Sequence, residues 1–287
     1  MRLLIYLIAA ATLSASCAAH RLDVASRAGD QKAHVASGGS FGATLETSDG
    51  RLSAALLQLA AMPTADAQRR VAIEYRRLGV LDMAQEHFSA AVKLDPTDAF
   101  SYDALARIAR DWGVPKMALA DARHAVVYAP RSAAAANTLG TVYQALGEIT
   151  EAKRWYVRAL GLDPAAWYAL NNLCYADIMT RESDAVTTCR RAVASAPDAT
   201  MVRNNFALAH GAAGDLVAAR QWFRRAGDAA TANYNYGILM MSTRAYREAE
   251  QAFQSALMSD PEFTLAASRA RQARLAALAE EHTRDSH

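Results

Sequence analysis

Large apolar residues recur along this chain at spacings of three, four and seven positions within short segments. That spacing is typical of amphipathic α-helices, so we expect a succession of helices with one apolar face each. The segments come in pairs, with glycine after the first segment and proline after the second, and both residues end helices. The pattern therefore predicts helical hairpins and no β-sheet.

Four positions of the second segment return at a fixed interval. The step is 34 residues from Ala84 to Ala118 and again from Ala118 to Ala152. The full sets are Ala84, Phe88, Ala91 and Pro96; Ala118, Ala122, Ala125 and Pro130; Ala152, Tyr156, Ala159 and Pro164; and, one residue early, Ala185, Cys189, Ala192 and Pro197. Hairpins that repeat at this period must stack on their neighbours, because one hairpin cannot bury its apolar face alone.

The third pair carries a family signature. Its first helix has Leu139, Gly140 and Tyr143, and its second has the set just given, so it resembles the tetratricopeptide repeat (TPR) at every position except the first aromatic one. This resemblance implies an all-α fold, a right-handed α-solenoid of stacked TPR hairpins. It covers residues 65–263 and implies six repeats, of which the fifth is shortened; they are 65–98, 99–132, 133–166, 167–199, 200–229 and 230–263.

Two segments flank the predicted repeats. Residues 51–64 contain a short apolar helix before Pro63, and residues 264–287 contain a helix of mixed charge followed by a tail. The ends of a repeat stack need polar-faced caps to stay soluble. We therefore expect an N-terminal and a C-terminal capping helix.

The first residues have the features of an export signal. Arg2 precedes an apolar run from Leu3 to Leu13, and small residues lead to Cys17, so residues 1–16 are predicted to be a signal peptide. Cys17 resembles the lipidated cysteine of the bacterial lipobox, although Leu13 lies one place further upstream than the usual leucine. The alternative is ordinary cleavage near Ala18, which would discard Cys17.

Residues 17–50 and the overall composition add two constraints. Residues 17–50 are rich in Ser, Gly, Ala, Asp and Thr, and such a segment buries too little apolar surface to offset the entropy of ordering, so we expect a flexible tether. The 287 residues include 31 basic and 29 acidic side chains. This balance gives no strong positive electrostatic field that would attract nucleic acid, and we expect no nucleic-acid partner.

Two further cysteines lie within the predicted fourth repeat. Cys174 occupies the small eighth position of its first helix, and Cys189 occupies the site that faces it in the second helix. A disulfide there suits an oxidising compartment. The alternative is a pair of packed, reduced thiols in the core.

Catalytic motifs are missing from the sequence. The seven histidines lie at non-equivalent repeat positions, and no GxSxG, HExxH or glycine-rich phosphate loop occurs. No histidine has metal-ligand spacing to another ligand. We therefore expect no enzyme activity, cofactor, metal or small-molecule substrate.

Asparagine is the informative polar residue. Asn172, Asn205 and Asn235 share the sixth position of repeats four to six, which in a TPR first helix faces the concave groove. The surrounding groove positions are Asn171, Asn204, Tyr168, Tyr175, Met201, Leu208 and Ile238. Amide side chains both donate and accept hydrogen bonds, so such a row predicts a groove for an extended peptide. The alternative is that these amides cap helices or bond between adjacent repeats.

The layout as a whole resembles bacterial TPR lipoproteins of the Tad pilus assembly and pilotin type. That resemblance implies a protein-interaction scaffold of the cell envelope, an outer-membrane lipoprotein facing the periplasm that binds a protein or an extended peptide segment. A periplasmic peptide-binding, chaperone-like adaptor and a regulator of a cell-wall enzyme are the alternatives. Fold alone does not decide among them.

Overall fold

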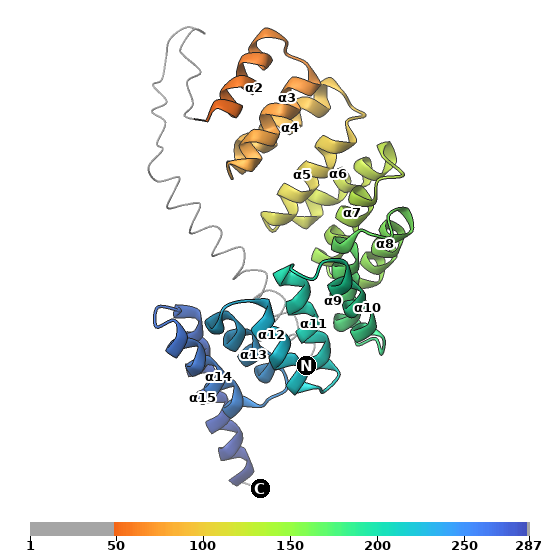
Figure 1. The fold of residues 1–287 in the computed structure, drawn as a ribbon. Helices are drawn as coiled ribbons and strands as arrows, with labels where there is room; N and C mark the ends of the chain where they lie inside the picture. The colour runs from red at the N-terminus through yellow and green to blue at the C-terminus, as the bar shows by residue number, and fades with distance from the viewer. Residues whose placement is uncertain (1–48, 286–287) are drawn as a thin grey trace. The chain divides into compact units, whose positions relative to one another are not determined.

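A computed structural model describes residues 49–285, and every regular element in this range is an α-helix (Figure 1). Consecutive helices pack as antiparallel hairpins, so the all-helical fold of stacked TPR hairpins predicted from the 34-residue spacing is confirmed. The predicted signal peptide, Cys17 and most of the predicted tether lie outside the described residues. Between residues 49 and 285, no helix is both long enough and apolar enough to cross a membrane.

The described chain divides into two compact units, at the boundary between Ala169 and Leu170. The boundary between the N-terminal unit (49–169) and the C-terminal unit (170–285) falls within the sequence of α9 (Trp167–Thr180). Each unit is considered by itself below.

The N-terminal unit begins with α2 (Gly50–Ala61), which packs on α3 in the region predicted to form a cap. Three hairpins follow, and in each the two helices pack against one another. The hairpins are α3 (Ala65–Arg77) with α4 (Leu81–Leu94), α5 (Ala99–Asp111) with α6 (Pro115–Tyr128), and α7 (Ala133–Ala145) with α8 (Ile149–Leu162). Thr64 and Ser132 begin α3 and α7 by accepting backbone N–H groups with their hydroxyl oxygens.

The C-terminal unit continues the pattern from α9 onward. Its helices are α10 (Ala185–Ser195), α11 (Thr200–Ala212), α12 (Leu216–Ala226), α13 (Ala229–Ser242), α14 (Tyr246–Ser259) and α15 (Thr264–Asp285). The last helix, α15, packs on α14 through small residues, of which Ala266 and Ala273 are fully buried. A C-terminal capping role for α15 stays a prediction.

Close contact between a small and an aromatic residue holds the hairpins together. A Cβ on Gly140 would lie 2.6 Å from Tyr156 Cε1, and one on Gly237 would lie 2.7 Å from Phe253 Cε1. Both aromatic rings are fully buried. The ring of the second helix therefore rests directly on the backbone of the first, which only glycine permits at this distance.

The turn between the two helices of each hairpin adopts the left-handed backbone conformation. In four hairpins this residue is glycine, with φ between 77° and 86°; the residues are Gly79, Gly113, Gly147 and Gly214. In the other two hairpins the same turn position holds Arg181, with φ of 58°, and Arg244, with φ of 63°. A side chain in this conformation costs about 1–2 kcal/mol relative to glycine. Two turns of the C-terminal unit are therefore strained.

Candidate functional site

Asparagine pairs connect the first helices of successive hairpins in the C-terminal unit. Asn205 Nδ2 on α11 donates to Asn171 Oδ1 on α9 at 2.9 Å. One repeat later, Asn235 Nδ2 on α13 donates to Asn204 Oδ1 on α11 at 3.3 Å. Each bond runs from the sixth position of one repeat to the fifth position of the repeat before it. We call these four residues the Asn ladder.

The members of the Asn ladder differ in exposure. Asn171 and Asn235 are only 6% exposed, whereas Asn204 and Asn205 are half-buried. An amide side chain has two donor and two acceptor positions, and the two bonds use one polar atom of each residue. Asn171 and Asn235 are therefore nearly buried links between neighbouring first helices. Asn204 and Asn205 are the more exposed members of the Asn ladder.

Asn172 stands next to the Asn ladder but outside its two bonds. It follows Asn171 directly on α9 and is half-buried. Asn205 and Asn235 share the sixth repeat position, and each bonds back to the fifth position of the repeat before it. Sequence spacing gives no sign of that offset.

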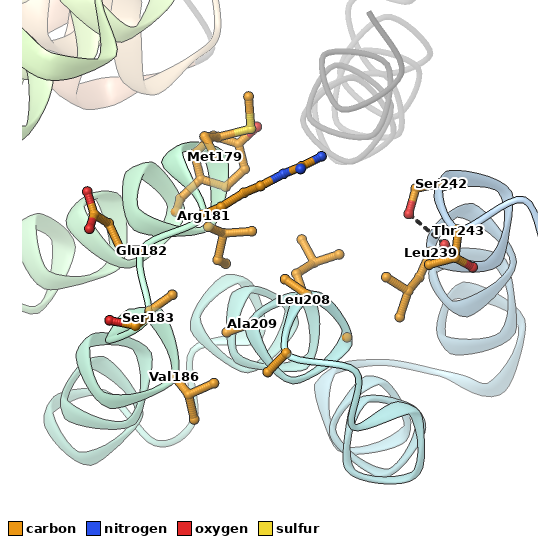
Figure 2. A pocket seen from close by; sticks show the side chains of 16 residues that line it. Met179, Arg181, Glu182, Ser183, Val186, Leu208, Ala209, Leu239, Ser242 and Thr243 are labelled. Atoms are coloured by element: carbon orange, nitrogen blue, oxygen red, sulfur yellow. Dashed lines mark hydrogen bonds between the residues drawn. The ribbon is translucent and has the colours of Figure 1, made fainter. Parts of the chain in front are cut away.

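A pocket opens one helical turn beyond the Asn ladder. Tyr175, Leu208 and Leu239 each follow a ladder asparagine by four residues, on α9, α11 and α13, and all three line the pocket. Figure 2 labels Leu208 and Leu239. Residues four apart lie on the same face of a helix, so the amides and the pocket share one surface. The volume of the pocket is about 440 Å³, within the range of ligand pockets in proteins. Below, this site is called the α9–α11–α13 pocket.

Apolar side chains form the walls of this pocket. Ile178, Val186 and Ala209 line it, and they also pack in the apolar cluster that surrounds Cys174 and Cys189. A disulfide bond joins these two fully buried cysteines, with a Cα–Cα distance of 4.8 Å. The disulfide links α9 to α10 at the two sites where other hairpins place a small residue against a ring. It therefore backs one wall of the pocket.

The opposite wall depends on a glycine. A Cβ on Gly211 of α11 would lie 2.5 Å from Leu239 Cδ2 on α13, closer than real Cβ contacts occur. Leu239 can therefore lie against the α11 backbone only because residue 211 has no side chain. A larger residue at 211 would push Leu239 toward the space it now lines.

Polar residues stand at the rim of the pocket. Ser242 Oγ and Thr243 Oγ1 donate to backbone carbonyls of α13, so both hydroxyl hydrogens are engaged. Glu182 accepts a hydrogen bond from Thr180 Oγ1 at 3.4 Å. Figure 2 shows the Arg181 side chain extending over the pocket, with its guanidinium pointing away from Glu182. Arg181 therefore presents positive charge above an apolar floor.

Two residues predicted to lie in the groove have other surroundings. Tyr168 belongs to the N-terminal unit, where it packs beside Ala136 and Ala159, and burial raises the pKa of its hydroxyl. Ile238 packs in the core around Phe253 and does not line the pocket. Its neighbour Leu239 is the residue of α13 that reaches the pocket.

The N-terminal unit bridges its first helices with different chemistry. Arg107 Nε on α5 donates to Thr138 Oγ1 on α7 at 3.2 Å, and Arg110 Nη1 donates to Thr141 Oγ1 at 2.7 Å. Arg107 also forms an ion pair with Asp103 at 3.1 Å. We call the two arginines and two threonines the Arg–Thr ladder. The sequence analysis did not predict it, although each arginine precedes its threonine by the same 31 residues.

A further arginine of the N-terminal unit lies among aromatic rings. The guanidinium carbon of Arg76 lies 5.8 Å from the ring centres of both Phe88 and Phe100. Burial, and secondarily the positive charge of Arg107, lowers the pKa of Arg76. This face of the N-terminal unit is therefore charged where the matching face of the C-terminal unit carries neutral amides.

Neither unit offers a metal centre. Within residues 49–285, no three His, Cys, Asp or Glu side chains gather as metal ligands would. Of the sequence-predicted residues, the structure brings Asn171, Asn204, Asn205 and Asn235 together and places Tyr175 in the adjoining pocket.

Comparison with known proteins agrees with this architecture. Residues 133–165 match the family model of the tetratricopeptide repeat. No curated protein matches the chain by sequence. The chain is similar to the APC/C hetero-tetramer Cut9-Hcn1, with a TM-score of 0.63 and 17% identity, over 78% of this chain and 46% of that chain. It therefore spans less than half the length of that protein.

Two smaller solved structures resemble the chain over most of their own length. PilW, a widely conserved type IV pilus biogenesis factor, has a TM-score of 0.60 and 20% identity, covering 69% of this chain and 94% of that chain. PilF of Pseudomonas aeruginosa has a TM-score of 0.57 and 18% identity, covering 74% and 96%. At these identities the likeness concerns the fold. The described chain is thus built from stacked helical hairpins of the tetratricopeptide-repeat kind.

Proposed function

We propose that this protein is a non-enzymatic scaffold that holds an extended segment of a partner protein on the surface formed by α9, α11 and α13. The observation that carries the proposal is the alignment of half-buried amides with an apolar pocket one helical turn further along the same helices. Amides can pair with the backbone of an extended chain, and a pocket can take one of its side chains. TPR proteins in general bind protein or peptide partners.

The exposed part of the Asn ladder makes the polar contact in this proposal. Asn204 and Asn205 are half-buried and lie beside Asn172. Asn171 and Asn235 hold the helices at the spacing that sets these amides in a row. Tyr175 and Leu208 then supply apolar surface next to them.

A photo-crosslinking experiment tests this surface. We would place a benzophenone amino acid at Met179, which lines the pocket, and as a matched control at Met258, which is 79% exposed on α14 and lies outside the pocket. We expect irradiation of the full chain in its host to join a partner protein to the first variant and not to the second. Equal crosslinking from both positions, or none from Met179, would contradict the proposed surface.

We further propose that the chain works in the bacterial cell envelope. The disulfide between Cys174 and Cys189 suits an oxidising compartment, and the features of residues 1–17 suit export with a lipid anchor on Cys17. Labelled fatty acid should enter the wild-type chain and be absent from the Cys17→Ser variant. A soluble, unlabelled wild-type product would contradict the anchor and leave the binding surface unaffected.

Assistance to a pilus or secretion machine is the envelope role that we favour. Its support is the similarity in fold to PilW, described as a type IV pilus biogenesis factor, and to PilF. The protein crosslinked at Met179 would decide the matter, since a pilin or secretin subunit is expected. A broad set of unrelated exported proteins would instead favour the chaperone-like adaptor.

A further inference from the structure

Two strained arginines lie at the turns on either side of the α9–α11–α13 pocket. Arg181, in the turn after α9, lines the pocket, and Arg244 directly follows the lining residue Thr243 in the turn after α13. The turn between them, after α11, contains Gly214, which adopts the same left-handed conformation without strain. Both arginines thus occupy a position where four other hairpins use glycine.

The rest of the described chain gives these arginines no structural role. Within residues 49–285 neither guanidinium forms an ion pair, a side-chain hydrogen bond or a contact with a ring, and both residues are exposed. Two other arginines of the same unit do pair with carboxylates: Arg203 binds Asp198, and Arg247 binds Glu281. Backbone strain without an internal partner points to an external one.

We infer that the pocket receives a large apolar side chain of a partner segment, and that acidic side chains on both sides of it bind Arg181 and Arg244. The walls of the pocket are apolar, its volume of about 440 Å³ suits a bulky side chain, and Glu182 at the rim is already bonded to Thr180. Arginine binds carboxylates by paired, charge-assisted hydrogen bonds. This inference rests on the proposed function, because it specifies the segment held on the same surface.

The spacing of the arginines decides between two sources of carboxylate. They belong to the turns of the fourth and sixth repeats, with a whole repeat between them. A single free C-terminus brings one carboxylate and can serve one of the two turns. An internal segment with acidic residues before and after the apolar residue can serve both.

Glycine substitution separates binding from folding at these positions. Arg181→Gly and Arg244→Gly each remove a guanidinium. They also relieve backbone strain, because glycine is the residue that the other hairpins use at this turn position. If the arginines serve only a partner, the double variant should melt about 2–4 °C or more above the wild type. The control is Arg190→Gln with Arg224→Gln, which removes two exposed charges from α10 and α12.

Selection of random peptides on the immobilised full chain tests the ligand chemistry. Two libraries would be displayed, one with internal random segments and one with a free C-terminus. We expect the internal library to yield a bulky apolar residue flanked on both sides by Asp or Glu. Binding of that selected peptide should fall about a hundredfold in the double glycine variant, roughly tenfold per arginine, and stay unchanged in the control.

Several outcomes would overturn the inference while leaving the proposed function intact. They are enrichment of apolar peptides without acidic flanks, enrichment confined to free C-termini, and undiminished binding by the double glycine variant. A lowered melting temperature of that variant would also overturn it, because the arginines would then serve folding. If the wild type enriches no peptide at all, the proposed function itself fails, and this inference with it.

Discussion

The two units use the same hairpin but bridge their first helices with opposite chemistry. In the N-terminal unit, charged guanidiniums of Arg107 and Arg110 reach threonine hydroxyls of the next repeat. In the C-terminal unit, neutral amides of Asn205 and Asn235 reach back to amides of the repeat before. Small residues packed on rings are common to both units. The packing of the hairpins is therefore shared, and the polar bridges give the two surfaces different charge.

The disulfide is the strongest single difference between the units. Replacing Cys174 and Cys189 together by alanine opens a link that spans 15 residues, and we expect the free energy of unfolding to fall by about 3 kcal/mol. Hydrogen exchange read segment by segment should accelerate in residues 170–285 and stay unchanged in 49–169. Equal acceleration in both ranges would mean that the units unfold as one. A reducing agent on the wild type should reproduce the double variant.

The contact between glycine and ring should be equally sensitive in both units. Gly140→Ala and Gly237→Ala each place a methyl group where Tyr156 or Phe253 now rests, and each should cost about 1–3 kcal/mol. Gly161→Ala is the control, because nothing lies within 4 Å of a Cβ there, and alanine in a helix should raise stability by about 0.5–1 kcal/mol. Chemical denaturation measures all three. A large difference between the first two would break the claim of shared packing.

The Asn ladder should respond to mutation in a way that depends on its buried member. Asn205→Ala leaves Asn171, which is 6% exposed, without its bonding partner, and should cost about 1–3 kcal/mol. Adding Asn171→Ala should restore part of that loss, because no buried amide is then unsatisfied. A double-mutant cycle measures the coupling. Purely additive losses would show that the bond contributes nothing to the bracing of α9 and α11.

The smallest expected difference between the units is in how their stability changes at acid pH. Hydrogen bonds from Arg77 to Asp49 and from Arg70 to Asp66 lower the pKa of both carboxyl groups in the N-terminal unit. Their stabilising effect is complete above the unfolded pKa of about 3.9 and is lost as the pH falls through the lower folded values. Melting followed between about pH 5 and pH 2 should show a slight decline in this unit.

The variant Asp66→Asn should flatten the acid response of the N-terminal unit. Asp121 gives the opposite sign within the same unit, because burial raises its pKa and acid favours its folded, protonated form. Asp121→Asn should therefore steepen the decline. An unchanged slope in both variants would assign the acid response to other groups.

Much of the helical architecture could be predicted from the sequence, because the spacing of small and aromatic residues directly records which backbones approach closely. Gly140 with Tyr156 is such a record. The partners of polar residues could not be predicted in the same way. Repeat position places Asn235 on a face, but the stagger between helices decides that it meets Asn204 and lies nearly buried.

The pocket was also beyond prediction, for a different reason. The pocket depends on the missing side chain of Gly211 and on the backbone conformation of the turn at Arg181. The spacing of hydrophobic residues along the sequence reports neither feature. The exchange of glycine for arginine at the fourth and sixth turns was visible once the repeats were aligned. A role in binding can be inferred for these arginines only once the pocket beside them is known, and residues of three helices form that pocket.

The location of the disulfide within a single hairpin has a consequence for how the chain matures. The chain has three cysteines, and three cysteines can pair in three ways. A thioether-linked lipid on Cys17 would withdraw that sulfur from thiol exchange and leave the pairing of Cys174 with Cys189 alone. These two residues, 15 apart, would also leave a translocation channel in close succession. Correct oxidation then needs no proofreading isomerase, provided that lipid attachment comes first.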